Sequence, residues 1–273
     1  MFLSCSTLGG LRSTASAELF LTDQIRTLTR VHDAGYSVVE LYHGDHPRWV
    51  SDTMKVAVED YHLRPYSIHL PKFLFTYEEE RFNRTMEAVF RFVADVGIEV
   101  AVLHPPNEEQ IAGDEWRGMM EGLLRGSEEA GCRLTFEIVP YLHSPQDFIS
   151  DQIRYYEGRD LGVTVDIEFM HILGLDILRL WDMFGESIHN IHFRDSDGSL
   201  LDSDGKRKYL LPGTGRVDLR AVVRDLRSVG YSGAITVEVS HRNRENIVLA
   251  KEYAEWCISD EAEEKEEDPA RSS

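Results

Sequence analysis

Eight short apolar runs, rich in β-branched residues, alternate with longer amphipathic segments along this chain of 273 residues. This alternation is typical of repeated strand–helix units that build a parallel sheet. Two of the runs, Val100 to Leu103 and Leu161 to Val165, show little polar alternation, as expected for strands covered on both faces. An open doubly wound sheet would also satisfy this pattern. Eight strands favour closure, so we expect a single-domain α/β fold, a (β/α)8 barrel.

The runs place the expected strands near Phe2 to Ser4, Ser37 to Leu41, Tyr66 to His69, Val100 to His104, Arg133 to Ile138, Gly162 to Asp166, Ile188 to Phe193 and Ala234 to Val239. Helices are expected around Leu19 to Ala34, Val50 to Tyr61, Glu78 to Val96, Glu108 to Ala130, Pro145 to Tyr156, Ile177 to Phe184, Leu219 to Val229 and Asn243 to Trp256. Several of these helices stop at a glycine, the residue that best adopts a left-handed conformation, at Gly35, Gly97, Gly131 and Gly230.

The chain length fits one barrel domain, which we expect over residues 1–257. Residues 258–273 hold seven acids against Lys265 and Arg271, a composition typical of a solvated, disordered tail. The N-terminus reads as the first barrel strand rather than a signal peptide, because it has no basic leader and no long apolar stretch.

The charge balance is strongly acidic, with 29 Lys and Arg residues against 48 Asp and Glu and a formal net charge of −19. Because such a surface repels phosphates, we expect no nucleic-acid partner. A hydrophobic content of 42% and a mean hydropathy of −0.32 indicate no membrane span. The three widely separated cysteines, Cys5, Cys132 and Cys257, indicate neither a disulfide framework nor a thiolate zinc site, and we expect a cytoplasmic location.

Metal-competent side chains stand at or near the ends of six of the expected strands: His69, His104, Glu137, Asp166, His192 and Glu238. A parallel barrel brings these ends together on one face. A histidine in a strand is more often a hydrogen-bonded core residue, but a carboxylate that interrupts an apolar strand must be paired or bound to metal. Three such carboxylates predict a shared cation. Oxygen and imidazole ligands without thiolates suit Mn, Mg, Co or Zn.

Several short motifs, taken in order, make the chain resemble the xylose isomerase-like TIM barrel superfamily, which includes sugar phosphate isomerases, sugar epimerases, inosose dehydratase and endonuclease IV. The motifs are Ser67-Ile68-His69-Leu70-Pro71, Val102-Leu103-His104-Pro105-Pro106, Phe136-Glu137, Val165-Asp166, Ile191-His192-Phe193-Arg194-Asp195-Ser196, Leu211-Pro212-Gly213-Thr214-Gly215 and Thr236-Val237-Glu238. The resemblance extends from Leu3 to about Trp256.

In the epimerase branch, the resemblance implies one divalent ion held by Glu137, Asp166, His192 and Glu238. It implies that Glu137 and Glu238 act as acid and base: one removes a proton beside a carbonyl, the metal holds the resulting enediolate, and the other returns a proton. We therefore predict an isomerase or epimerase that acts on a small carbohydrate-like substrate. His69 and His104 would position substrate oxygens or recruit a second metal. A related lyase and a homo-oligomer are both compatible with this prediction.

Endonuclease IV is the alternative enzyme, because it also has histidines at the positions of His69 and His104. Its trinuclear zinc site needs a further histidine where this chain has Phe169, and an Asp-x-His pair where it has Arg207, Lys208 and Tyr209. A three-zinc cluster that cuts abasic DNA is therefore not expected, and the acidic surface argues the same way. A third hypothesis is a non-catalytic barrel.

Phe169 also departs from the epimerases, many of which use a histidine there to bind a substrate oxygen. Glu168 or His171, expected on the same loop, could substitute for it. Arg194 and the Lys206-Arg207-Lys208 cluster are candidates for contact with an anionic substrate, against the simpler reading of solvated charges. Lys72 after the third strand, Glu40 at the end of the second, and Tyr42, His43 and His46 are further candidates, each with a structural alternative.

Overall fold

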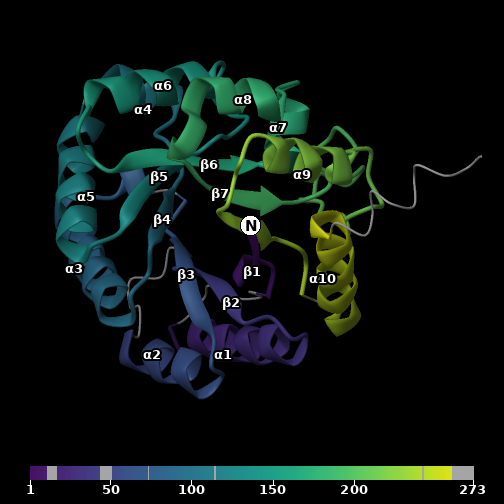
Figure 1. Ribbon diagram of the computed structural model, residues 1–273. Coiled ribbons are helices and arrows are strands. Elements are labelled where there is room, and N and C mark those ends of the chain that lie inside the picture. Colours follow the sequence, from purple (N-terminus) through teal and green to yellow (C-terminus); the bar gives the residue numbers. More distant parts are fainter. Residues whose placement is uncertain (11–16, 44–50, 73, 114, 242, 260–273) are drawn as a thin grey trace, which may run out of the picture.

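The eight expected strands form a closed parallel barrel (Figure 1). The strands follow one another in sequential order, and β1 pairs with both β2 and β8. The computed structural model describes residues 1–10, 17–43, 51–72, 74–113, 115–241 and 243–259. The strands are β1 (Phe2–Ser6), β2 (Val38–Tyr42), β3 (Arg64–His69), β4 (Val100–Leu103), β5 (Arg133–Glu137), β6 (Leu161–Asp166), β7 (Ile188–Phe193) and β8 (Ala234–Val237). The predicted single-domain (β/α)8 barrel is confirmed.

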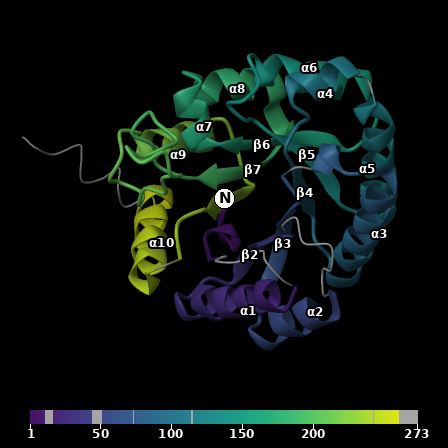
Figure 2. The same ribbon diagram turned by 180° about the vertical axis from the view of Figure 1, so that it is seen from behind.

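Helices surround the barrel on its outside (Figure 2). They are α1 (Ala17–Asp33), α2 (Ser51–Asp60), α3 (Glu79–Val96), α4 (Glu108–Gly113), α5 (Trp116–Ala130), α6 (Pro145–Tyr155), α7 (Ile167–Ile172), α8 (Ile177–Phe184), α9 (Leu219–Ser228) and α10 (Arg244–Ile258), with 3-10 turns at Leu8–Gly10, Leu74–Thr76 and Gly185–Ser187. No helix within the described ranges is long and apolar enough to cross a membrane.

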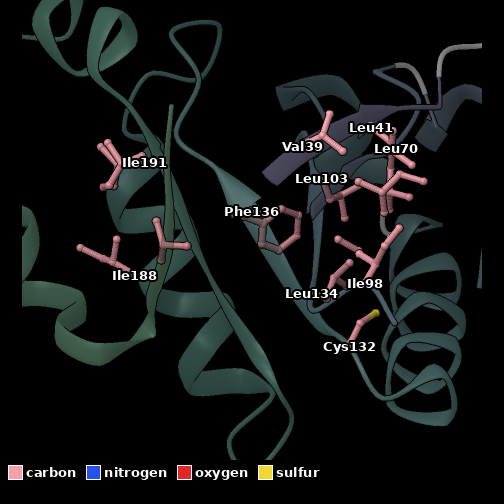
Figure 3. Packing of buried hydrophobic residues seen from close by; sticks show 14 of the residues in the cluster. Val39, Leu41, Leu70, Ile98, Leu103, Cys132, Leu134, Phe136, Ile188 and Ile191 are labelled. Atoms are coloured by element: carbon pink, nitrogen blue, oxygen red, sulfur yellow. The ribbon is translucent and has the colours of Figure 1, made fainter. Parts of the chain in front are cut away.

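Each strand directs alternate residues to opposite faces of the sheet. On β5, Leu134 and Phe136 are fully buried in the apolar layer between strands and helices, and Figure 3 shows them with Leu103 of β4. On β7, Ile191 belongs to the same layer. Complete burial of one such aliphatic side chain contributes about 1.5–3 kcal/mol, so this outer layer is the main stabilising core.

The interior of the barrel is layered by polarity. At the amino ends of the strands, the second apolar cluster comprises Val38, Tyr66, Val100, Val102 and Ala234. Further along, the buried inward-facing positions become polar: the hydroxyls of Thr135 and Thr164 lie 2.8 Å apart. The carboxyl ends then hold the buried acids and histidines. The order of these layers, from apolar to ionisable, places the ionisable groups at the carboxyl end of a closed barrel whose interior is otherwise packed.

Two helical predictions need correction. The segment Glu108 to Ala130 is two helices rather than one, because α4 ends at Gly113, a residue that disfavours helix. Residues 167–172, expected as a loop, form α7 directly after β6. The carboxylate of Asp166 caps this helix by accepting a hydrogen bond from the Phe169 backbone N–H at 3.1 Å.

Other local predictions fit the structure. Gly35, Gly97, Gly131 and Gly230 all have φ between 72° and 83°, the left-handed conformation that ends a helix. The three cysteines are free and buried. Helix α10 ends at Ile258, and the acidic segment 260–273 lies outside the described residues.

Candidate metal and substrate site

The six predicted strand-end residues all lie at the carboxyl end of the barrel. His69, Glu137 and Asp166 are the last residues of β3, β5 and β6, His192 is near the end of β7, and His104 and Glu238 directly follow β4 and β8. All six are at most 8% exposed. The strand register sets Asp166 beside His192, so the geometry depends on the backbone pairing as well as on side-chain conformation.

The imidazole of His192 lies between two carboxylates. Its Nδ1 is 2.8 Å from Glu137 Oε1 and its Nε2 is 3.2 Å from Glu40 Oε2. Burial alone would favour the neutral ring, but Glu40 and Glu137 together raise the pKa of His192 well above its ordinary value. His192 therefore has one nitrogen directed at the candidate metal ligands and the other held by Glu40.

Glu137 also contacts the two remaining histidines. His104 Nε2 lies 2.6 Å from Glu137 Oε2, and His69 Nε2 lies 3.5 Å from the same oxygen. Burial lowers the pKa of His104 to about 4, although Glu137 opposes this shift. For Glu137, burial favours the neutral acid, but His104 and His192 hold its pKa well below the ordinary value. Glu137 is thus an ionised carboxylate at neutral pH.

Asp166 and Glu238 share a third partner, the guanidinium of Arg194. Its Nη1 lies 3.1 Å from Asp166 Oδ2 and 3.2 Å from Glu238 Oε2. Burial raises the pKa of Asp166 to about 7, with Arg194 opposing the shift. Burial also favours neutral Glu238, but Arg194 and His192 lower its pKa below the ordinary value. Burial therefore opposes ionisation of both carboxylates, and the shared guanidinium favours it.

Glu168 links this cluster to the loop between β7 and α9. Its carboxylate contacts Arg194 Nη2 at 2.8 Å and forms a two-point ion pair with Arg207, whose Nη1 donates at 2.8 Å. The ring of Phe169 lies 5.5 Å from the Arg194 guanidinium, and Tyr209 lies 5.1 Å from it. Glu168, a candidate substrate-binding residue, therefore binds two arginines in the structure.

The remaining candidate residues from the sequence lie around the strand-end cluster, on its border or outside the described residues. His171 lies in the last turn of α7, half-buried, and Lys206 is exposed. Lys72 is half-buried near the site, where its charge lowers the pKa of both His104 and Glu238. Tyr42 is buried beside His69, with ring centroids 5.5 Å apart, and His46 lies outside the described residues. Glu40 is fully buried and contacts His192, in agreement with the structural alternative considered for it.

Sequence reasoning missed several residues that organise the site. Asn190 donates to Glu40 at 3.0 Å and accepts from Thr236 at 2.7 Å. Asp195 accepts hydrogen bonds from the backbone N–H groups of Gly213 and Gly215 at 2.9 and 2.8 Å, which shapes the glycine turn. Asn190 interrupts an apolar strand in the sequence, and that polar interruption was the available signal.

A divalent cation fits the donor set. Ligand atoms of Glu137, Asp166 and His192 all lie within 4.8 Å of one another, and His69, His104 and Glu137 form a second such group. Glu238 Oε2 is 3.6 Å from His192 Nδ1, beside the first group. Among the described residues, Glu238 Oε1 is buried without a hydrogen-bond partner, which leaves an oxygen available for coordination. Oxygen and imidazole donors in this number suit hard and borderline divalent ions.

The fold and the strand-end cluster define a metal-competent α/β barrel, and comparison with known proteins assigns the family. The family model of the xylose isomerase-like TIM barrel matches residues 28–259, and the chain belongs to this family.

Among curated proteins, the chain is similar to an inosose isomerase of Bacillus velezensis, with 24% identity over 255 residues that cover 82% of this chain and 88% of that protein. Among solved structures, a D-tagatose 3-epimerase-like protein matches with a TM-score of 0.72 at 16% identity, covering 98% of this chain and 100% of the other. An IolI protein with a bound zinc atom matches with a TM-score of 0.69 at 20% identity, covering 95% and 98%.

Proposed function

We propose that this protein is a metal-dependent sugar isomerase or epimerase that moves a proton beside the carbonyl of a small sugar or sugar-derived substrate. The observation that carries the proposal is the convergence of Glu137, Asp166 and His192 within 4.8 Å, with Glu238 alongside. The similarity to an inosose isomerase and to a 3-epimerase-like structure supports the substrate class. The zinc-containing IolI structure supports the use of a metal.

Glu137, Asp166, His192 and Glu238 would hold the ion. When bound, it supplies a positive charge that stabilises negative charge developing on adjacent substrate oxygens. Glu137 and Glu238 are the candidate proton carriers: neighbouring cationic groups hold both pKa values below the ordinary value, so each is an ionised carboxylate that has a site for a proton. Neutral His104, with a pKa of about 4, has a single N–H, and its Nε2 faces Glu137 Oε2 at 2.6 Å, so its role would be to orient that carboxylate.

Burial of the cluster explains how the site would control water and orientation. The barrel interior beneath it is closed by packed side chains, so substrate must enter from the carboxyl ends of the strands. His69 Nδ1 lies 2.8 Å from the backbone oxygen of Leu70, which leaves Nε2 on the side of Glu137. His69 and His104 therefore line one side of the proposed reaction site in fixed orientations.

The test combines metal analysis with proton exchange. Protein purified without chelator is analysed for bound metal and then incubated in deuterium oxide with a panel of ketoses and aldoses. We expect one divalent ion per chain and deuterium incorporation beside the carbonyl of at least one sugar. Glu137→Gln and Glu238→Gln should each abolish incorporation while the fold is kept, whereas Glu99→Gln, an exposed partner of Arg64, should retain it. Exchange that persists in both site variants would refute the assigned roles.

The same measurement discriminates the rival readings. Three ions per chain and cleavage of abasic DNA would favour an endonuclease IV-like enzyme. No bound metal after saturating supply and no exchange would favour a barrel that has lost catalysis. A second ion at His69, His104 and Glu137 would appear as a stoichiometry of two that falls to one in a His104→Gln variant.

A further inference from the structure

Arg194 lies among the carboxylates that we propose as metal ligands. One nitrogen, Nη1, contacts Asp166 Oδ2 at 3.1 Å and Glu238 Oε2 at 3.2 Å, and so bridges two of the four proposed ligands. The other nitrogen, Nη2, lies 2.8 Å from Glu168 Oε2. The Arg194 side chain is only 5% exposed, so these carboxylates, rather than water, compensate its charge.

Glu238 lies closer to the Arg194 guanidinium than to the imidazole of His192, another of the proposed metal ligands. Asp166 belongs to the group with Glu137 and His192 whose ligand atoms lie within 4.8 Å of one another, whereas Glu238 lies beside that group. Its Oε2 is closer to Arg194 Nη1, at 3.2 Å, than to His192 Nδ1, at 3.6 Å. A cation bound beside Asp166 and His192 would therefore attract the same Glu238 carboxylate that Arg194 contacts.

A bound ion and the guanidinium would repel one another across this short distance. Both are positive and both would be attracted to the carboxylates of Asp166 and Glu238, in a buried place where water screens charges weakly. We propose that Arg194 is an internal counter-cation with which the divalent metal competes for Asp166 and Glu238. This inference rests on the proposed metal site and adds a role for a residue outside the ligand set.

Other contacts would hold the Arg194 guanidinium after a metal ion had drawn Asp166 and Glu238 away from it. Glu168 keeps its contact to Nη2 and is itself fixed by the two-point ion pair with Arg207. The rings of Phe169 and Tyr209 lie 5.5 and 5.1 Å from the Arg194 guanidinium and favour a cation there. Arg194 can therefore release Asp166 and Glu238 without becoming an isolated buried charge. In this arrangement, Phe169 supplies one of the aromatic rings that pack against the arginine.

If Arg194 supported the metal ligands instead of competing with the ion, its loss would change the affinity for metal in the opposite direction. A buried arginine can also support a metal site, because it can donate to carboxylate oxygens that coordinate the ion and hold them in place. In that case, loss of Arg194 weakens metal binding. In the competition proposed here, loss of Arg194 leaves buried carboxylates uncompensated until the ion binds, so the affinity for metal increases.

The experiment is a calorimetric titration of Mn²⁺ into chelator-treated protein. Arg194→Met is expected to bind Mn²⁺ about tenfold more tightly than wild type, or tighter still, and to show a larger Mn²⁺-induced rise in Tm. Arg194→Lys retains the buried charge but not the forked donors, so it protects against failure to fold. It should bind Mn²⁺ more tightly than wild type by about threefold. Unchanged or weaker affinity in these variants would overturn the proposal.

Two control variants separate the possible failures. Arg207→Met alters the same Glu168 cluster, but Arg207 has no ion pair to Asp166 or Glu238 within the described structure, and we expect its Mn²⁺ affinity to stay within about twofold. Equal tightening in this variant would trace the effect to overall charge and overturn the competition. Asp166→Asn should sharply weaken Mn²⁺ binding. Unchanged binding there would remove the proposed metal site itself, whereas a loss there with no gain in Arg194→Met would overturn the present inference alone.

Discussion

His192 Nε2 lies 3.2 Å from Glu40 Oε2, on the side of the ring opposite the 2.8 Å contact between Nδ1 and Glu137 Oε1. Glu40 is held in turn by Ser67, which donates to the same Oε2 at 2.8 Å. With Asn190 as a further donor, the carboxylate connects strands β2, β3 and β7 beneath the site. Glu40 thereby fixes the orientation of His192 without itself belonging to the proposed ligand set.

We predict that Glu40→Gln weakens Mn²⁺ binding by about 10–100-fold, the usual cost of losing a residue that orients a metal ligand. The amide removes the negative charge beside Nε2 and places a donor among groups that already donate. It should also lower the pKa of His192, because Glu40 is one of the two carboxylates that raise it. Calorimetric titration and histidine NMR at varied pH measure the two effects. Affinity and pKa equal to wild type would contradict the orienting role.

The fold was predictable from the sequence because burial on the two sides of each strand leaves different patterns. Leu134 and Phe136 face the helices while Thr135 and Glu137 face the interior, so the apolar runs and the strand ends could be recognised without coordinates. The split of α4 from α5 and the presence of α7 were not recognised, because each depends on one local residue. Asp166 both ends a strand and caps the next helix.

The convergence of strand ends was equally predictable, since any parallel barrel brings them to one face. Whether these residues bind metal and carry protons stays a prediction. The pairing of Arg194 with Asp166 and of Arg207 with Glu168 could not be derived from the sequence, because it depends on how long side chains cross between loops. The expected contact of these arginines with an anionic substrate also stays a prediction; in the structure they contact carboxylates of the protein.

Asp195 gives a prediction about the loop that follows β7. Its carboxylate accepts from the backbone N–H groups of Gly213, Gly215 and Ser196 at 2.9, 2.8 and 2.7 Å. In Asp195→Asn, an amide NH2 would face these donors, so we expect a loss of about 1–3 kcal/mol in stability and faster amide exchange over residues 213–217. Hydrogen–deuterium exchange with mass spectrometry measures the local effect, and chemical denaturation measures the global one.

Asp202→Asn is the matched control for this loop. Asp202 also accepts from backbone N–H groups, those of Asp204 and Lys206, but in an exposed turn. We expect its effect to be a few tenths of a kcal/mol and its faster exchange to stay within residues 204–206. If both variants loosen residues 213–217 equally, Asp195 has no special role in holding the glycine turn.

We predict that replacement by alanine has opposite effects on stability at two glycines of α5. A Cβ at Gly118 would meet no atom within 4 Å, whereas a Cβ at Gly126 would lie 2.5 Å from a ring carbon of Phe90. Gly118→Ala should stabilise the protein by about 0.5–1 kcal/mol through the better helix propensity of alanine. Gly126→Ala should destabilise it by about 1–3 kcal/mol because the α3–α5 contact is overpacked. Equilibrium denaturation in urea measures both, and two stabilising results would show that Phe90 moves aside freely.

The burial of His241 leads us to predict how the stability of the protein depends on pH. The ring is fully buried, Nε2 lies 3.8 Å from Cys5 Sγ, and burial followed by the charge of Arg30 lowers the pKa of His241 to about 3. Because the unfolded chain protonates near pH 6.5, it binds more protons than the folded chain between about pH 3 and 6.5. The contribution of His241 is therefore present above this window and is lost as the pH falls through it.

The slope of unfolding free energy against pH tests this assignment. Inside the window, one such histidine adds a positive slope of up to about 1.4 kcal/mol per pH unit. His241→Asn should remove that part of the slope, measured by urea denaturation at intervals between pH 4 and 6.5. The control is His62→Asn, an exposed position with φ of 51° that asparagine tolerates, and it should keep the wild-type slope. Parallel curves for all three proteins would mean that His241 does not remain neutral in the folded state.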